Sequence, residues 1–137
     1  MTFLAATLLT ALTYKGDRVS LELDQTTVSD LRVTNVAVGN GQYHGAGMWI
    51  CPRARIDDGL LDVTIVEKLS LWQLLSSLGY LFNGRIAEHA RVRCFQTRRC
   101  AGTVVEGSSA IELDGEAIGY LPVEIEVVPA AVRMIVP

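Results

Sequence analysis

The chain has 137 residues, of which half are hydrophobic and a fifth are charged, and its net charge is -3. This length and composition suit one folded domain with a real core and exclude a disordered chain. The acidic balance argues against a nucleic-acid partner, which usually requires a basic surface. The three cysteines form no Cys-x-x-Cys pair, so no zinc ribbon or dithiol redox motif is indicated.

The chain begins with an apolar segment over residues 1–13. Leu4, Leu8 and Leu12 follow helical spacing, which predicts a core helix that ends at Gly16. A signal peptide is the weaker alternative, because the segment lacks a basic beginning and is too short to span a bilayer. We therefore expect a cytoplasmic protein, with any contact to a membrane at its periphery.

After Gly16 the hydrophobic pattern changes to a period of two residues. Val19, Leu21 and Leu23 alternate with polar residues, which predicts a half-buried strand. Further β segments are predicted at 31–38, 43–50, 60–66, around Val92 and Cys94, and at 102–105, 110–113, 123–127 and 132–136. Many short strands separated by turn residues are typical of an antiparallel β-sandwich or barrel.

One internal helix is predicted from Leu71 to Asn83, with Ser70 before it and Gly84 after it as start and stop signals. Its apolar residues at helical spacing are Leu71, Leu74, Leu75, Leu78 and Phe82. Such a stripe is more typical of a helix that faces the core than of a ligand groove. The expected fold class is mainly β, an antiparallel β-sandwich with one N-terminal helix and one internal helix.

Asp114-Gly115-Glu116 is the first candidate site. Asp-Gly between two alternating segments is a strong signal for a tight hairpin, because glycine tolerates positive φ. A plain turn therefore explains the residues. The functional alternative is that carboxylates at a hairpin tip face a cleft, where one accepts a proton from a substrate hydroxyl or both hold a metal ion.

The second candidate is the turn from Arg55 to Asp62, which reads RIDDGLLD. Its three carboxylates beside a glycine are oxygen ligands of the type that Mg²⁺ or Ca²⁺ prefers. The spacing does not match an EF-hand loop, and a solvated acidic turn is the plain alternative.

The third candidate is the glycine-rich stretch 39–47, which reads GNGQYHGAG. Its spacing matches neither common phosphate-binding motif, and no helix follows directly. Glycines within a strand pattern more often mark a bulge or a close approach of two backbones.

Basic and histidine side chains complete the candidates. Arg91, Arg93, Arg98 and Arg99 form a cluster that is either an ordinary solvated surface or a contact with anionic lipid headgroups. His44 and His89 have no acid or cysteine at a ligand-like spacing, and we interpret both as structural.

Taken together and in this order, the motifs resemble the C-terminal domain of bacterial diacylglycerol kinase and sphingosine kinase-like lipid kinases. That family carries a segment like Val-x-Asn-Gly-x-x-x-Gly-Gly-Gly-Met-x-Ile-x-Pro-x-Ala-x-x-Asp-Asp-Gly-Leu-Leu-Asp. Residues 38–62 of this chain read VGNGQYHGAGMWICPRARIDDGLLD. In the family and in this chain, this segment is followed by a helix and a glycine. Asp-Gly-Glu, a proline and a final Val-Pro come after them. The resemblance covers the chain from Thr2 to its end.

The resemblance implies a single β-sandwich domain over residues 1–137 that receives a lipid and forms one wall of a cleft. Asp114 matches the general base for the lipid hydroxyl, and Glu116 matches the nearby acid of that site. In bacterial members a structural Mg²⁺ sits in the Asp-Asp-Gly-Leu turn. The matching ligands here are the side chain of Asp58 and the backbone carbonyls of Arg55 and Leu60.

Two departures from the family pattern stand out. Ala46 replaces the middle glycine of the family's triplet, and no Gly-Gly-Asp-Gly-Thr loop for ATP occurs in the chain. We therefore expect the substrate-binding, base-carrying part of an ATP-dependent lipid kinase of phospholipid metabolism, inactive without a nucleotide-binding domain. That domain would precede this one in a longer protein or be a separate chain.

The alternatives are a non-catalytic β-sandwich that binds a lipid or a protein partner, and a gene fragment without a role of its own. For the isolated chain we also expect self-association, through the predicted helix at Thr2 to Tyr14.

Overall fold

The computed structural model describes residues 15–133, and within that range the chain is mainly β. The strands are β1 (Asp17–Leu23), β2 (Thr26–Gly39), β3 (Leu61–Glu67), β4 (Val92–Thr97), β5 (Arg99–Glu106), β6 (Ala110–Leu113), β7 (Glu116–Tyr120) and β8 (Val123–Glu126). The helix α2 (Leu71–Ser77) continues into the 3-10 turn η1 (Leu78–Leu81), and η2 (Ile86–Glu88) follows. The predicted N-terminal helix lies outside the described residues.

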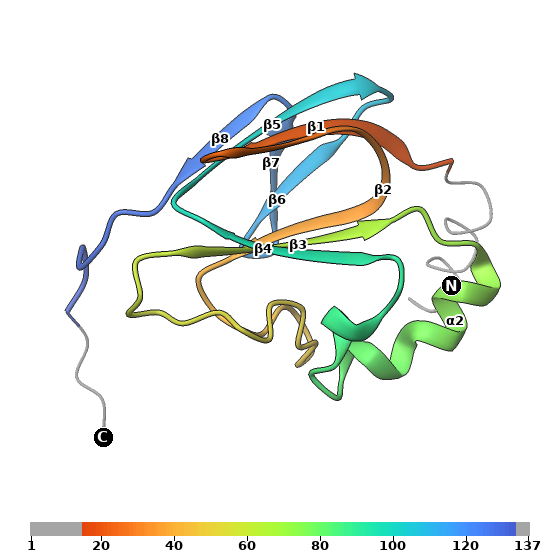
Figure 1. Ribbon diagram of the computed structural model, residues 1–137, viewed down its shortest axis with the longest axis horizontal. Coiled ribbons are helices and arrows are strands. Elements are labelled where there is room, and N and C mark those ends of the chain that lie inside the picture. The colour runs from red at the N-terminus through yellow and green to blue at the C-terminus, as the bar shows by residue number, and fades with distance from the viewer. Residues whose placement is uncertain (1–14, 134–137) are drawn as a thin grey trace.

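A six-stranded antiparallel sheet in the order β4-β3-β2-β1-β5-β8 forms the body of the domain. Its long strand β2 belongs to two layers, because residues 26–33 pair with β1 and residues 33–39 pair with β3. The register shifts between Val33 and Asn35, and such irregularities bend a strand. In Figure 1, β1, β5 and β8 accordingly lie above β3 and β4, in a sandwich-like arrangement.

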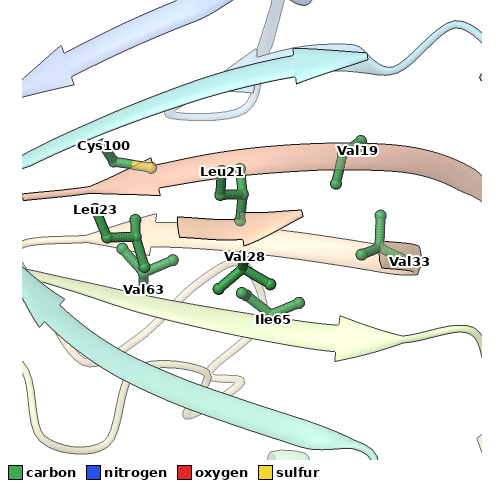
Figure 2. Close-up of a cluster of buried hydrophobic side chains, with 8 residues drawn as sticks. All are labelled: Val19, Leu21, Leu23, Val28, Val33, Val63, Ile65 and Cys100. Atoms are coloured by element: carbon green, nitrogen blue, oxygen red, sulfur yellow. The ribbon is translucent and has the colours of Figure 1, made fainter. Parts of the chain in front are cut away.

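The core lies between these two layers, as Figure 2 shows. It consists of Val19, Leu21 and Leu23 from β1, Val28 and Val33 from β2, Val63 and Ile65 from β3, and Cys100 from β5. Val63 and Ile65 have no exposed surface. Burying a side chain of this size stabilises the fold by about 1.5–3 kcal/mol relative to leaving it exposed, so this cluster is the main source of stability.

The predicted fold class, a mainly β antiparallel sandwich with an internal helix, is confirmed. The alternation of β1 is confirmed as well, since its three apolar side chains face the core. The predicted strand at 43–50 is wrong. That segment is a loop, and its one β-type pairing is an isolated bridge between His44 and Met48. Gly45 and Gly47 adopt positive φ, which interrupts the extended backbone that a strand requires. Residues 132 and 133, the described part of the last predicted strand, are not in a strand either.

The internal helix begins where the sequence predicts. Ser70 forms a capping box with Gln73, in which each side chain accepts a hydrogen bond from the other residue's backbone N–H. The α-helix ends at Ser77, earlier than predicted, and continues as η1. The prediction that its apolar stripe is core is wrong, since neither α2 nor η1 has a buried residue. Only one side of the helix packs on the sheet, and the stripe extends beyond that side.

Strands β6 and β7 form a separate two-stranded hairpin. Every residue of β7 is exposed, and only Ile111 of β6 is partly covered. A two-stranded hairpin is marginally stable in water without a surface to pack on. This element therefore differs from the rest of the fold in having almost no core of its own.

Candidate functional site

The tip of the β6–β7 hairpin carries the first predicted site. Leu113 pairs with Glu116, so Asp114 and Gly115 form a two-residue loop. Their φ angles are 50° and 90°, which is the pattern of a type I′ turn, the turn that fits the twist of a hairpin. The predicted tight turn is confirmed, and it leaves Asp114 and Glu116, which are separated by Gly115, exposed to solvent.

The hairpin is joined to the sheet at its base. The Ser109 hydroxyl donates a 2.9 Å hydrogen bond to Asp17 Oδ2 at the start of β1, and the Ser109 carbonyl accepts one of 3.0 Å from Leu121 N. Gly107 has a φ of 102°, and a Cβ there would overlap the Asp17 carboxylate. Only glycine suits this position, so the joint fixes where the hairpin leaves the sheet.

The Asp-Asp-Gly turn precedes β3 and is exposed. Asp58 Oδ1 accepts a 2.9 Å hydrogen bond from Leu60 N, while Gly59 has a φ of 69°. The Arg55 guanidinium makes two hydrogen bonds to Asp57, of 3.1 and 3.3 Å, and these lower the pKa of Asp57. Arg55 therefore pairs directly with Asp57, and its positive charge also acts on Asp58.

Asp62 is the acid of this turn whose surroundings sequence reasoning did not foresee. It is buried, and its Oδ2 accepts a 3.2 Å hydrogen bond from Gln96 Nε2. Burial raises the pKa of Asp62, while the Gln96 hydrogen bond and the positive charge of Arg53 oppose the rise and the negative charge of Asp58 adds to it. Asp58 and Asp62 thus feel each other's charge, and a cation beside Asp58 would relieve that repulsion.

The two predicted sites remain separate. Within residues 15–133, no three histidine, cysteine or carboxylate side chains come together as a metal-binding group. The acids of the hairpin and those of the turn are therefore not one centre. A cation at the turn would depend on Asp58 together with backbone carbonyls, which are oxygen ligands that Mg²⁺ accepts.

The glycine-rich loop packs onto the helical segment. Trp49 N donates a 2.6 Å hydrogen bond to the Leu81 carbonyl, and the Trp49 ring fills the space where a Cβ of Gly84 would stand. Within the loop itself, a Cβ at Gly39 would stand 3.0 Å from the Gly41 carbonyl oxygen, which is the predicted close approach of backbone, whereas the contact at Gly84 was not predicted. Ala46 is not among the residues of positive φ, so alanine suits the position where the family pattern has glycine.

A small apolar pocket of about 50 Å³ lies between α2–η1 and the sheet. It is lined by Val66, Leu69, Leu74, Ser77, Tyr80, Leu81, Ile86, His89 and Val92. Sequence reasoning missed this pocket. The one available signal was the stripe of leucines on the helix, which the sequence alone does not distinguish from an ordinary core face.

Both ring nitrogens of His89, in the wall of this pocket, make hydrogen bonds. Its Nδ1 accepts a 3.1 Å hydrogen bond from Arg91 N, so in the neutral ring Nε2 carries the proton and donates to Ser77 Oγ at 2.8 Å. The Tyr80 ring stands edge-on to the imidazole. These contacts support the structural interpretation of His89, which ties the end of α2 to the start of β4.

The predicted arginine cluster is divided between the two ends of β4. Arg91 and Arg93 both pair with Glu67, at 3.7 and 2.8 Å, near the start of the helical segment. Arg99 pairs with Glu124 on β8, at 2.6 Å. The four arginines therefore do not form one continuous basic patch.

Comparisons with known proteins agree with these features. Residues 1–136 match the family described as YegS C-terminal NAD kinase beta sandwich-like domain. The chain is 38% identical over 109 residues to a probable lipid kinase YegS-like of Xanthomonas axonopodis pv. citri. The matched region covers 74% of this chain and 33% of that protein. It is 33% identical over 121 residues to a diacylglycerol kinase of Mycobacterium tuberculosis, and this match covers 88% of this chain and 38% of that protein.

The fold has counterparts among solved structures. A crystal structure of a diacylglycerol kinase from Bacillus anthracis superposes with a TM-score of 0.69 at 22% identity, covering 93% of this chain and 44% of that one. The chain spans about a third of the length of the curated relatives it matches. Within residues 15–133, no helix is long and apolar enough to cross a membrane.

Proposed function

Since the chain belongs to the family of YegS C-terminal NAD kinase β-sandwich-like domains, we propose that it binds the lipid substrate and carries the catalytic base of an ATP-dependent lipid kinase. The acceptor is a lipid hydroxyl such as that of diacylglycerol. ATP is held by a nucleotide-binding domain, in the same polypeptide or in a partner chain, because these 137 residues contain no Gly-Gly-Asp-Gly-Thr loop.

The observation that carries this proposal is the position of Asp114. Its carboxylate stands at the tip of a tight turn on a hairpin that is almost entirely exposed. Such a group can enter a cleft formed with a second domain. The lipid oxygen attacks the γ-phosphorus of ATP, Asp114 accepts the hydroxyl proton, and ADP leaves with the electrons of the broken P–O bond.

Glu116 supplies the second acid of the proposed site. It lies on β7 with Ile118 and Tyr120, whose large side chains are both exposed. The register of the hairpin shifts between Ile111 and Glu112, which leaves Ile118 without a direct partner and interrupts the simple alternation of side chains. Exposed apolar side chains near two carboxylates suit contact with a lipid substrate at the edge of a domain interface, where water is excluded as the cleft closes.

The pocket under α2 is the proposed place for the start of an acyl chain. Its lining is mostly aliphatic, and its three polar members include Ser77 and His89, which already satisfy each other. A pocket of about 50 Å³ holds only a few methylene groups, so the helix has to move outward to admit a longer segment. The hydrogen bond between His89 and Ser77 resists this movement, as does the one from Trp49 N to the Leu81 carbonyl.

Mg²⁺ is a further part of the proposal, at the turn that precedes β3. The donor set fits a hard cation, with one carboxylate from Asp58, the carbonyls of Arg55 and Leu60, and water for the remaining positions. The ion would fix the turn and offset the repulsion between Asp58 and Asp62. Millimolar MgCl₂ should therefore raise the melting temperature of the chain, and Asp58→Ala should abolish this rise.

The test of the kinase proposal is to fuse the chain to the nucleotide-binding part of the M. tuberculosis relative and to measure phosphate transfer from ATP to diacylglycerol in vesicles. Asp114→Asn should lower the rate about 10²- to 10⁴-fold, the usual contribution of a general base. Its unfolding midpoint should not change, since the side chain is exposed.

Glu112→Gln is the matched control, because Glu112 is an exposed carboxylate on the same hairpin. It should leave the rate within about twofold of the parent. An unchanged rate in Asp114→Asn would show that the base is assigned wrongly. A folded fusion that binds lipid and nucleotide but transfers no phosphate would favour the non-catalytic alternative.

A further inference from the structure

The segment 71–82, which forms α2 and η1, contains no charged residue. Leu74 and Leu81 line the pocket. Four other apolar side chains of the segment are exposed to solvent, with Trp72, Leu75, Leu78 and Phe82 being 81, 40, 42 and 60% exposed. We refer to these four residues as the outer helix face.

An ordinary surface helix turns a charged or polar face to water. The outer helix face instead presents two large aromatic and two aliphatic side chains to solvent, at intervals of three or four residues along the chain. Exposing such a set to water is unfavourable, and contiguous apolar patches of this kind mark binding surfaces. Trp72, with an apolar ring and one N–H donor, belongs to the residue type that gathers where a bilayer meets water.

The charged side chains close to this face in the sequence are mostly positive. Between residues 67 and 93 there are four cationic side chains, Lys68, Arg85, Arg91 and Arg93, and two carboxylates. The net charge of this segment is therefore +2, on a chain whose total is -3. Lys68 stands before the uncharged helix, and Arg85 after it pairs with Glu88. Arg91 and Arg93 share the one carboxylate of Glu67. Exposed apolar side chains on a segment of net positive charge are complementary to an anionic, apolar surface.

A second copy of the chain is a poorer occupant. A symmetric dimer would place the outer helix face against itself and bring the two positive segments together. A bilayer with anionic headgroups instead accepts the apolar side chains and attracts the flanking cations.

We propose that the outer helix face inserts into the headgroup and upper acyl region of an anionic bilayer and docks the domain there. This inference rests on the proposed function for the presence of a lipid substrate, since the pocket beneath the same helix would then open next to the bilayer. It adds the surface by which the domain reaches that substrate, and it commits to anionic membrane lipid as the partner.

The experiment uses the 137-residue chain with vesicles of phosphatidylcholine, with and without phosphatidylglycerol. We expect the chain to float with the anionic vesicles, more weakly with the neutral ones, and to show a blue shift of tryptophan emission. Brominated acyl chains should quench that emission. Trp72→Phe should bind with nearly the same affinity and lose most of the shift, because the remaining Trp49 has its Nε1 atom buried.

Trp72→Gln combined with Phe82→Ser should weaken partitioning about tenfold or more, since both side chains lose their apolar contact with the bilayer. The matched control is Val128→Gln, at an exposed apolar residue that follows β8, and it should bind like the parent. Circular dichroism of each variant confirms that α2 is retained.

Equal vesicle binding by the parent and the double variant would overturn the proposal. So would a blue shift that grows with protein concentration in the absence of vesicles, because a second copy would then cover the face. These assays contain no ATP, so they are independent of the kinase test. Asp114→Asn should bind vesicles like the parent even where it abolishes phosphate transfer.

Discussion

The six-stranded sheet and the β6–β7 hairpin differ in how many buried side chains stabilise them. The sheet encloses eight buried side chains between its layers, whereas every residue of β7 is exposed. Yet the two carboxylates proposed to act in catalysis, Asp114 and Glu116, lie on the hairpin. The proposed chemistry is therefore carried by the element that contributes least to folding, and the sheet serves to support it.

The largest expected effect tests the sheet side of this comparison. Ile65→Ala removes a side chain with no exposed surface from the centre of the core and should lower the free energy of unfolding by about 2–5 kcal/mol. Urea denaturation of the isolated chain measures this. Ile118→Ala, on the exposed face of β7, should change the same quantity by less than about 0.5 kcal/mol. Similar losses in the two variants would contradict the division between sheet and hairpin.

The joint between the two regions gives an intermediate effect. Gly107→Ala forces a side chain into a left-handed conformation and against the Asp17 carboxylate, which should cost about 1–3 kcal/mol. It should also lower the rate of the kinase fusion by misplacing Asp114. Gly79→Ala is the control, because Gly79 has open space and no positive φ, and it should be neutral or slightly stabilising. An unchanged rate in a destabilised Gly107→Ala would mean that the joint does not position the hairpin.

The smallest effect concerns pH and the buried acid of β3. The pKa of Asp62 is raised in the folded state, so its stabilising contribution is present below the pKa of the unfolded chain and is lost as pH rises through the folded pKa. Asp62→Asn keeps an acceptor for Gln96 and should be more stable than the parent at neutral pH. The difference should vanish below about pH 4, and thermal melts across that range measure it. A variant less stable at pH 7 would show that the Asp62 charge is compensated in the fold.

Local signals in the sequence predicted much of this structure. The period of β1, the helix start at Ser70 and the Asp-Gly turn each depend on residues close together in the chain, and all three are found. The loop at 43–50 was missed because single glycines outweigh a β-type composition. The contact of Trp49 with Gly84 joins residues 35 positions apart, and no local pattern indicates such a partner.

The candidate site divides in the same way. Asp114, Glu116 and Asp58 were found as motif residues, and their local turns are as expected. The apolar pocket and the outer helix face were not predicted. A run of leucines has the same appearance whether its helix is buried, half-buried or exposed on both sides, and only the packing of α2 on the sheet decides between these cases.

The shared strand β2 has a consequence for how the domain opens. One half of it is the hydrogen-bonding template for β1 and the other half is the template for β3, so neither layer can be lost without disrupting the other. The sheet should therefore unfold cooperatively, and its amide protons should exchange with solvent at a common slow rate. The amides of β6 and β7 should exchange much faster, as a unit that opens while the sheet remains intact.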